Sequence, residues 1–380
     1  MTNNKAAHKK IPLLDLTKQI APIRAEIDTA IKNVIDSCAF IGGKEIQQFE
    51  KAVADYAKTK FAVGCSNGTD SIRLSLIALG IKPGDGVICP TYTYFATAGA
   101  VSSIGAIPVF ADIDPETFTV SAEALEQSIK NTKNIVLRAI IPVHLYGLCA
   151  QMDEILPIAQ KYSLATIEDT AQAFGAEYKG KKAGSIGECG SISFFPGKNL
   201  GAFGDAGMIT TNNAALSERI KLYRNQGNKE KYFHEVLGFN HRLDTIQAAV
   251  LNVKLRYIDS WNKKRARNAT FYDSQLKGLP VITPPVPSYT THIYHQYVLR
   301  APGCRDKLIE HLQANGIDAR IYYPLPLHLQ PCFSFLGYKK GMFPVSEKAS
   351  EEVLAIPVYP DLTHSDLEYI VSSIHTFFGK

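Results

Sequence analysis

Three short stretches of the chain contain side chains that could do chemistry. SNGTD, at residues 66–70, lies between a predicted strand and a predicted helix, so backbone N–H groups at the helix N-terminus could bind a phosphate. ATIEDTAQAFGA places Glu168 and Asp169 at the end of another predicted strand, where open α/β sheets bind ligands. SISFFPGKNLGAFGDAG holds Lys198 in a glycine-rich loop, and a lysine that loses its proton in a pocket can attack a carbonyl group.

Each stretch also has a simpler interpretation. Thr69 or Asp70 could cap the following helix without binding any ligand, and Asp169 could do the same for the next helix. A single lysine such as Lys198 is more often solvated than catalytic. The glycines of GSIGECG resemble a dinucleotide-binding loop, but they precede a strand instead of joining a strand to a helix, so we reject that interpretation.

Taken together, the three stretches favour one cofactor. A phosphate cradle, a strand-end carboxylate and a lysine 29 residues later (198 − 169) match the three reactive parts of pyridoxal phosphate. These parts are a phosphate, a pyridine nitrogen that must stay protonated, and an aldehyde that condenses with an amine. A lysine-dependent lyase or aldolase that uses no cofactor is the alternative.

The elements that must position these residues alternate along the first half of the chain. The runs FAVGC, GVICP, IPVFADI, IVLRAIIPV and ATIED are predicted strands. Helices are predicted over residues 44–58, from about residue 121, and over residues 151–162. Short apolar runs separated by amphipathic helices are typical of βαβ units, so we expect a parallel sheet covered by helices.

After about residue 210 the pattern becomes mainly helical. The stretch RLDTIQAAVLNVKLRYIDSWNKKRARNATFY predicts one long helix, and HIYHQYVLR and RDKLIEHLQANG predict a strand and a helix. We expect a large α/β domain over residues 1–255, which includes the N-terminal segment, and a smaller C-terminal α+β domain over residues 256–380. The long helical stretch would connect the two domains.

Composition narrows the class of protein. The net charge is +5 (41 − 36), and the basic residues do not run in blocks, so a nucleic-acid partner is not expected. The seven cysteines are odd in number and far apart, which argues against disulfides and a zinc site and favours a reducing cytoplasm. We expect no metal, no membrane span and no signal peptide.

The ordered motifs of the chain resemble the DegT/DnrJ/StrS family of pyridoxal-phosphate-dependent nucleotide-sugar aminotransferases. The similarity runs from about Ile11 to the C-terminus. The family implies a fold-type-I transferase with a mainly parallel seven-stranded sheet covered by helices, plus a smaller C-terminal α+β domain. The motifs that carry the resemblance are SNGTDSIRLSL, PTYTYFATAGAV, IPVHLYG, IEDTAQAFGA, SFFPGKNLGAFGDAG, GFNHRLDTIQAAVL and YYPLPLHLQP.

The resemblance assigns roles around the cofactor. Lys198 would hold pyridoxal phosphate as a Schiff base and act as the catalytic residue, and Asp169 would pair with the pyridinium nitrogen. Gln172 would contact the 3′-hydroxyl, and Tyr94 would stack on the ring. The phosphate contacts would come from Gly68, Thr69, Asp70 and Ser193, together with Asn240 of a neighbouring subunit, which implies a homodimer that shares its active sites.

The family also implies the reaction. The amino group of L-glutamate would pass to a keto-deoxysugar nucleotide, with a 3-keto, dTDP-linked sugar favoured, and the amino sugar would serve a surface polysaccharide or a glycosylated metabolite. Arg242, Tyr322 and His328 could hold the diphosphate and the sugar, although His328 could equally be a structural loop residue. His241 and Arg224 are further candidates that could instead be solvated.

Two other functions stay open. One is amination of a 4-keto sugar linked to UDP or GDP, and the other is a regulatory protein that binds pyridoxal phosphate without catalysis. Two positions depart from the common family pattern: Gly197 stands where Ser or Thr is frequent, and Ala206 stands where Gly is frequent. Neither change removes an essential group.

Overall fold

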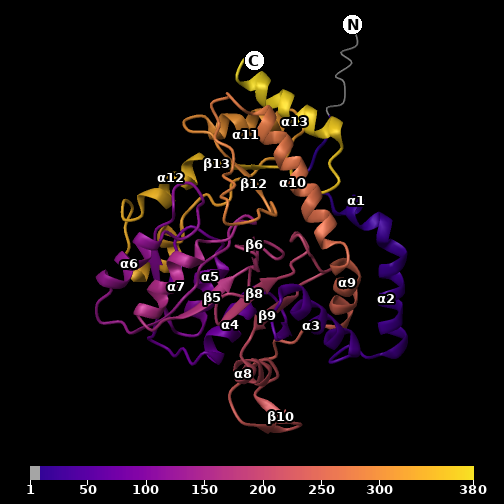
Figure 1. Ribbon diagram of the computed structural model, residues 1–380, viewed down its shortest axis with the longest axis vertical. Helices are drawn as coiled ribbons and strands as arrows, with labels where there is room; N and C mark the ends of the chain where they lie inside the picture. The colour runs from indigo at the N-terminus through magenta and orange to yellow at the C-terminus, as the bar shows by residue number, and fades with distance from the viewer. Residues whose placement is uncertain (1–8) are drawn as a thin grey trace.

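A seven-stranded sheet forms the centre of the protein, whose computed structural model describes residues 9–380 (Figure 1). Only β9 runs antiparallel to its two neighbours, and the other adjacent pairs are parallel. This result confirms the predicted mainly parallel seven-stranded sheet. In spatial order the strands are β1 (Phe61–Cys65), β9 (Gly207–Thr211), β8 (Cys189–Ser193), β5 (Ala165–Asp169), β4 (Leu137–Ile140), β2 (Gly86–Pro90) and β3 (Ile107–Ala111).

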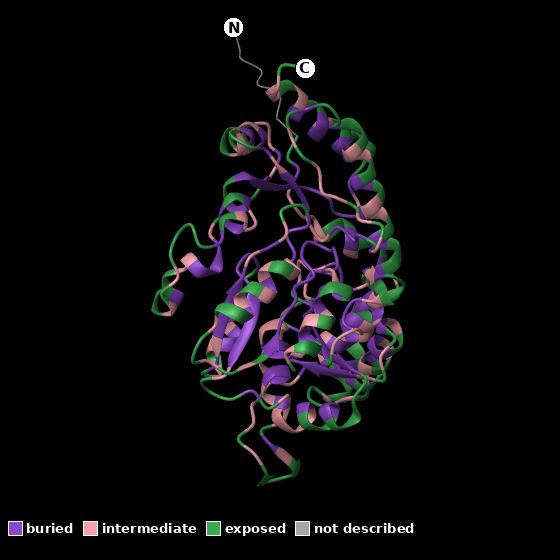
Figure 2. Cartoon of the chain, turned by 60° about the vertical axis from the view of Figure 1, so that its left-hand side comes forward, coloured by how far each residue is buried: buried purple, intermediate pink, exposed green. Residues whose placement is uncertain are grey.

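Helices cover both faces of the sheet because successive strand residues point to opposite sides. In β2, Val87 and Cys89 pack in one apolar cluster with α4 and α5, whereas Ile88 packs in another with α6 and α7. Buried positions therefore follow the strands and the inner faces of the helices (Figure 2). The helices of this part are α2 (Arg24–Ser37), α3 (Lys44–Ala57), α4 (Gly68–Ala78), α5 (Ala96–Ser103), α6 (Ala122–Asn131), α7 (Met152–Lys161), α8 (Ala214–Arg224) and α9 (Thr245–Leu255).

The prediction of one long helix after about residue 242 is wrong, because this stretch forms two helices. α9 ends at Leu255 and α10 (Ile258–Gln275) begins after a turn in which the Tyr257 N–H bonds to the Lys254 carbonyl at 3.0 Å. The buried side of α10 then changes along its length. Trp261 packs in the apolar cluster that contains α9, and Tyr272 packs among C-terminal residues.

The C-terminal part contains a two-stranded antiparallel sheet flanked by helices. Its strands are β12 (Tyr297–Arg300) and β13 (Val353–Ile356). The predicted strand HIYHQYVLR is too long, since residues 292–296 form a loop whose N–H groups bond to Gly147 and Tyr146. The helices are α11 (Arg305–Ala314), α12 (Pro344–Glu352) and α13 (His364–Phe377).

The N-terminal segment packs against this C-terminal part. Ile11 is buried and exchanges backbone hydrogen bonds with the chain around Ile317: its N–H bonds to the Gly316 carbonyl at 2.8 Å, and its carbonyl accepts from Asp318 N–H at 2.9 Å. Ile11 therefore belongs to the C-terminal apolar cluster. The division between residues 255 and 256 stays a prediction, and the described N-terminal segment packs on its C-terminal side.

Several smaller elements lie before or between these helices and strands. α1 (Leu16–Ile20) precedes α2, and the hairpin β6 (Glu177–Tyr178) and β7 (Lys181–Lys182) lies before β8. The hairpin β10 (Asn228–Glu230) and β11 (Phe233–His234) projects from the body beyond α8, at the bottom of Figure 1. Among residues 9–380 there is no helix that combines the length and the apolar character needed to cross a bilayer.

Candidate active site

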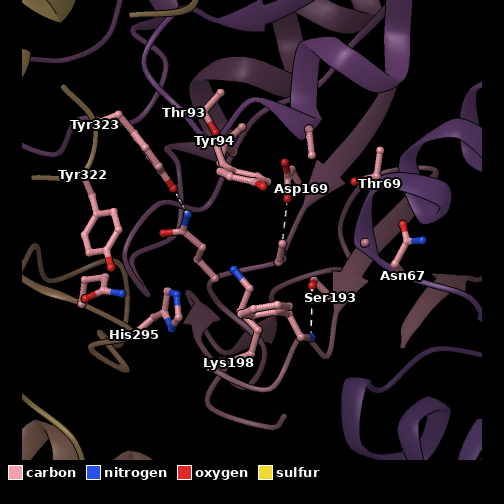
Figure 3. Close-up of a pocket in the computed structure, with 18 of the residues that line it drawn as sticks. Asn67, Thr69, Thr93, Tyr94, Asp169, Ser193, Lys198, His295, Tyr322 and Tyr323 are labelled. Atoms are coloured by element: carbon pink, nitrogen blue, oxygen red, sulfur yellow. Dashed lines mark hydrogen bonds between the residues drawn. The ribbon is translucent and has the colours of Figure 1, made fainter. Parts of the chain in front are cut away.

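A cavity of about 910 Å³ collects most of the predicted site residues (Figure 3). It is lined by the first turn of α4, by loops that follow β2, β4, β5 and β8, and by segments from both ends of the chain. The predicted residues that line it are Gly68, Thr69, Asp70, Tyr94, Asp169, Gln172, Ser193, Lys198 and Tyr322. Asn240, Arg242 and His328 do not line it.

Asp169 is the last residue of β5 and is buried at the cavity wall. Thr97 Oγ1 donates to its Oδ2 at 2.8 Å, and the Ala171 N–H donates to its Oδ1 at 3.2 Å. Burial raises the pKa of Asp169, while these hydrogen bonds and the charge of Lys198 act in the opposite direction. A carboxylate held in this way can accept a further hydrogen bond from a cationic ring nitrogen.

Lys198 lies in the tight loop that follows β8. Its N–H bonds to the Phe195 carbonyl at 2.8 Å, and a Cβ on Gly201 would come within 2.2 Å of the Pro196 carbonyl oxygen, so only glycine fits there. Burial lowers the pKa of the Lys198 amine to about 8, although Asp169 opposes this shift. The Lys198 amine therefore loses its proton more readily than that of an ordinary lysine, and the uncharged form is the nucleophile.

The first turn of α4 forms an anion cradle beside Ser193. The prediction that Thr69 or Asp70 caps this helix is wrong, because the cap is Asn67, whose Oδ1 accepts the Asp70 N–H at 2.8 Å. The backbone N–H of Asp70 is thus already used, and those of Gly68 and Thr69 have no protein acceptor among the described residues. A Cβ on Gly68 would lie 2.6 Å from Ser193 Cβ, so glycine lets the helix start approach the strand end.

The Asp70 carboxylate holds this helix start in place. It accepts hydrogen bonds from Ser66 Oγ at 2.5 Å and Asn67 Nδ2 at 2.8 Å. It also pairs with Arg73 at 3.0 Å and lies 3.3 Å from His241 Nδ1. Through these contacts the Asp70 carboxylate fixes the first turn of α4, which carries the free N–H groups of the cradle.

Gln172 and Tyr94 lie where a planar ring could be held. Gln172 accepts the Tyr146 N–H at 2.9 Å and donates to the Tyr323 hydroxyl at 2.8 Å, which fixes its amide in the cavity. Tyr94 is 58% exposed, and its ring centroid lies 6.2 Å from that of Tyr323. Tyr323 and Thr97 are site residues that sequence reasoning missed, although both lie in or next to motifs that carry the family resemblance.

His328 and Arg224 occupy structural positions. His328 is buried between Thr91 Oγ1, 2.7 Å from its Nδ1, and Glu347, 3.1 Å from its Nε2. Arg224 donates to Glu50 at 2.7 Å and to the Gly64 carbonyl at 2.9 Å. For His328 this placement matches the alternative of a structural loop residue.

Asn240 and Arg242 lie at the base of the β10–β11 hairpin. The backbone of Asn240 forms an isolated bridge with Asn225, and its side chain is exposed. Arg242 contacts Asn225 Oδ1 at 3.4 Å. Neither residue reaches the cavity of its own chain, so any contact with a cofactor would have to be made in another subunit.

Glu168, next to Asp169, serves the fold and not the cavity. It is fully buried, and its carboxylate accepts backbone N–H groups of Gly184, Ile186 and Gly187 at 2.6–2.9 Å. His144 Nε2 lies 2.9 Å from the same carboxylate. The glycine-rich GSIGECG segment therefore wraps around a buried carboxylate, which accounts for its composition without a dinucleotide.

A second buried lysine holds the Lys198 loop from the side of α9. Lys254 donates to the Gly201 carbonyl, and its Nζ lies 5.5 Å from the ring centroid of Phe203 and 5.9 Å from that of Trp261. Burial lowers its pKa to about 8. Gln247, also on α9, accepts the Phe203 N–H at 2.8 Å, so this helix fixes the far end of the loop at two points.

The cavity has two walls of different origin. The inner wall, formed by Gly68, Thr69, Asp169, Ser193 and Lys198, comes from the sheet and α4. We call outer wall the largely apolar group of lining residues near the two ends of the chain; the polar residues Arg265, His295 and Gln296 also line the cavity from the C-terminal part. The outer-wall residues are Leu13, Leu14, Ile321, Tyr322 and Val358.

The sequence matches the model of the DegT/DnrJ/EryC1/StrS aminotransferase family over residues 22–375. The chain belongs to this family. It is 44% identical over 97% of its length to a "Pleiotropic regulatory protein" of Geobacillus stearothermophilus, of which 98% is covered. It is 40% identical to the dTDP-3-amino-3,4,6-trideoxy-alpha-D-glucose transaminase of Streptomyces venezuelae, with 98% of this chain and 97% of that protein covered.

A solved structure extends the match to three dimensions. The crystal structure of S. venezuelae DesV in complex with a ketimine intermediate superimposes with a TM-score of 0.94 at 39% identity, and it covers 98% of this chain and 99% of that one. The protein is thus a pyridoxal-phosphate-dependent aminotransferase, as the motifs predicted. The inner wall fits that cofactor, because it offers free N–H groups for a phosphate, a buried carboxylate for a ring nitrogen and a weakly basic lysine.

Proposed function

We propose that this aminotransferase transfers the amino group of L-glutamate to a nucleotide-linked keto-deoxysugar, with a 3-keto, dTDP-linked sugar as the favoured substrate. The observation that carries the proposal is the single cavity in which Lys198 and Asp169 face an apolar outer wall. A deoxysugar has a hydrogen in place of one or more hydroxyl groups, so it presents apolar edges that such a wall can bury. The named substrate class of the 40% identical transaminase, a dTDP-linked 3-amino trideoxysugar, supports the same choice.

The residues of the inner wall would share the chemistry. Bound pyridoxal phosphate supplies an aldehyde for amine exchange and a ring that takes up the electrons released when a Cα proton leaves. The Gly68 and Thr69 N–H groups and Ser193 would bind its phosphate, and Asp169 would keep its ring nitrogen protonated. Lys198 Nζ would hold the cofactor and, once free, would take the proton from Cα and deliver it to the former aldehyde carbon of the cofactor.

We propose that two copies of the chain share their active sites. Asn240 cannot reach its own cavity, and the hairpin beside it exposes three large apolar side chains, Tyr232 (79%), Phe233 (71%) and Leu237 (96%). Exposed apolar groups on a projecting hairpin are typical of a surface that another chain covers. Sedimentation of the purified protein as a monomer would contradict this arrangement. The seven free cysteines suit a cytoplasmic location.

The test is a two-part assay. A panel of 3-keto and 4-keto sugars linked to dTDP, UDP and GDP is incubated with glutamate, and aminated products are read by mass. We expect the 3-keto dTDP-sugar to react best, and a predominant 4-amino product would overturn the C3 preference. Lys198→Ala should lose both the absorbance of lysine-bound cofactor and all detectable transfer, and retained turnover would overturn the mechanism.

The regulatory alternative rests on the name of the 44% identical relative. A protein with that role would bind pyridoxal phosphate but would not pass an amino group to it. A spectral titration with glutamate separates the two functions. We expect glutamate to convert the bound cofactor to its amino form, and an unchanged spectrum at saturating glutamate would favour regulation.

A further inference from the structure

His295 lies on the cavity wall beside Lys198 and has no role in the reaction described so far (Figure 3). It belongs to the loop between α10 and β12, which the sequence predicted to be part of a strand. The loop is held at both ends, because Ile293 N–H bonds to the Gly147 carbonyl at 3.0 Å and Gln296 N–H bonds to the Tyr146 carbonyl at 3.2 Å. Its ring is therefore carried by a fixed backbone.

The hydrogen bonds around His295 determine which ring nitrogen carries the proton. Asn199 Nδ2 donates to the Ile293 carbonyl at 3.1 Å, so the amide oxygen of Asn199 must be the atom that faces His295. His295 Nδ1 lies 3.2 Å from that oxygen and must be the donor. In the neutral ring Nε2 is then an unprotonated acceptor, and it has no hydrogen-bond partner among the described residues.

The surroundings keep this ring neutral. Burial, followed by the charges of Lys198 and Arg265, holds the pKa of His295 well below its ordinary value. Arg265 is itself buried and donates to the carbonyls of Tyr294 at 3.2 Å and His295 at 3.4 Å, so it restrains the same loop. A neutral ring with a fixed tautomer leaves one nitrogen lone pair available as an acceptor near neutral pH.

Two other acceptors of the cavity, the Asp169 carboxylate and the Gln172 amide oxygen, are already committed. The Asp169 carboxylate accepts a hydrogen bond from Thr97 and would accept another from the ring nitrogen of the cofactor. Gln172 Oε1 accepts the Tyr146 N–H. The group that must arrive beside Lys198 is an amine, since an amino donor displaces the lysine in one half of the reaction and the product amine leaves in the other. An amine needs an acceptor to orient its N–H bonds while its lone pair points at the reacting carbon.

We propose that His295 Nε2 is the hydrogen-bond acceptor that orients the amino group of the incoming donor beside Lys198. This role rests on the proposed function and adds to it a residue for the amine-exchange step. Asn199 is the positioning residue that selects the tautomer, and it directly follows Lys198 in the chain. No proton is transferred to His295, because the ring only accepts a hydrogen bond.

Two substitutions of His295 test the roles of the two ring nitrogens separately. Asn places its amide near the position of Nδ1, so His295→Asn keeps the bond to Asn199 and removes the acceptor from the cavity. Gln places its amide near the position of Nε2, so His295→Gln restores an acceptor there. We expect kcat/KM for conversion of the bound cofactor by glutamate to fall roughly 10- to 100-fold in His295→Asn and to recover by about tenfold in His295→Gln.

The loop offers a matched control. His292 is also buried and accepts the Tyr294 N–H at 3.0 Å, but it does not line the cavity. His292→Asn should leave the glutamate reaction within about threefold of wild type. Circular dichroism and cofactor affinity, measured for all three variants, identify any that fail to fold. A folded His295→Asn with wild-type kcat/KM, or a folded His295→Gln no better than His295→Asn, would overturn the proposal.

A second measurement needs no catalysis. Histidine-selective 15N NMR of the cofactor-free protein, with the His295 signals assigned by their loss in His295→Gln, reports the tautomer directly. We expect a protonated Nδ1 and an unprotonated Nε2, and Asn199→Leu should shift the ring toward a mixture. A protonated Nε2 in wild type would overturn the proposal even if the enzyme is active. Conversion of the cofactor by glutamate with no sugar product would instead overturn only the proposed substrate.

Discussion

The inner and outer walls of the cavity are built by different means. The residues of the inner wall lie at strand ends and at the first turn of α4, and neighbours such as Thr97, Asn67 and Ala171 fix them through hydrogen bonds. The outer wall is made of apolar side chains from segments near residues 13–14, 321–322 and 358 that lie outside the large sheet. One wall is held by directional bonds, and the other by packing.

Because of this difference, we expect the inner wall to determine the rate of the reaction and the outer wall to determine which sugar binds. Groups that exchange protons need positions fixed within a fraction of an ångström, which strand ends and helix termini provide. A wall that buries the apolar edge of a sugar needs shape more than direction, so its residues can change without moving Lys198 or Asp169. Substitutions on the inner wall should therefore impair both halves of the reaction, and those on the outer wall only the half that uses the sugar.

The largest expected effect comes from Asp169→Asn. An amide cannot carry the negative charge that keeps the ring nitrogen protonated, so we expect the rate of the glutamate half of the reaction to fall roughly 100- to 1000-fold. Stopped-flow absorbance of the bound cofactor measures this rate. The sugar half should slow to a similar degree, because the same ring nitrogen serves both.

Asp112 provides the matched control for this change. Asp112 directly follows β3, and Asp169 is the last residue of β5, so both lie at the carboxyl ends of parallel strands of the large sheet. The Asp112 carboxylate, however, accepts the N–H groups of Val345 and Ser346, and Asp112 does not line the cavity. Asp112→Asn should cost some stability and leave the rate nearly unchanged. Equal losses in the two variants would mean that Asp169 acts through the fold alone.

A smaller and one-sided effect is expected from Leu14→Gln on the outer wall. Replacing this partly buried apolar side chain by an amide should raise KM for the sugar nucleotide by about tenfold. Conversion of the cofactor by glutamate should not change. Val136→Gln, at an exposed position outside the cavity, is the control. A slower glutamate reaction in Leu14→Gln would show that the two walls are not independent.

The smallest effect concerns Lys254, which supports the inner wall without reaching the cavity. Its pKa is lowered to about 8 in the folded protein, so between pH 8 and its ordinary value near 10.5 the unfolded chain binds more protons. Wild type should therefore gain stability relative to Lys254→Met as the pH rises through this window, by about 2 kcal/mol between pH 7.5 and pH 9.5. Urea unfolding of both proteins at pH 7.5 and 9.5 measures the difference. A difference that stays constant with pH would contradict a buried ammonium group at Lys254.

The inner wall was predictable from the sequence because its residues follow local rules. Apolar runs of strand length predict the sheet, and Asp169 and Lys198 stand next to such runs. The family motifs then name their roles. The cap of α4 was assigned to the wrong residues, because Asn67, Thr69 and Asp70 are all suitable caps and only the folded backbone selects among them.

The remaining features depend on contacts between distant parts of the chain. The amphipathic pattern continues across Arg256 and Tyr257, so nothing local marks the break between α9 and α10. His295 lies in a run that alternates as a strand does, yet its neighbours bond to Gly147 and Tyr146 instead of a strand. In the sequence Leu14 is an ordinary apolar residue. Only the fold shows that it approaches the Lys198 loop, where its Cδ2 lies 3.6 Å from the position that a Cβ on Gly197 would occupy.

The pairing of Ile11 with Ile317 has a consequence for the order in which the enzyme is made. The sheet needs nothing beyond β9, which ends at Thr211, so a chain still on the ribosome can bring the residues of the inner wall together. Ile11 must then wait for more than 300 later residues before it meets its partner Ile317. During synthesis the sheet can thus bring Asp169 and the first turn of α4 together well before the outer wall closes over them.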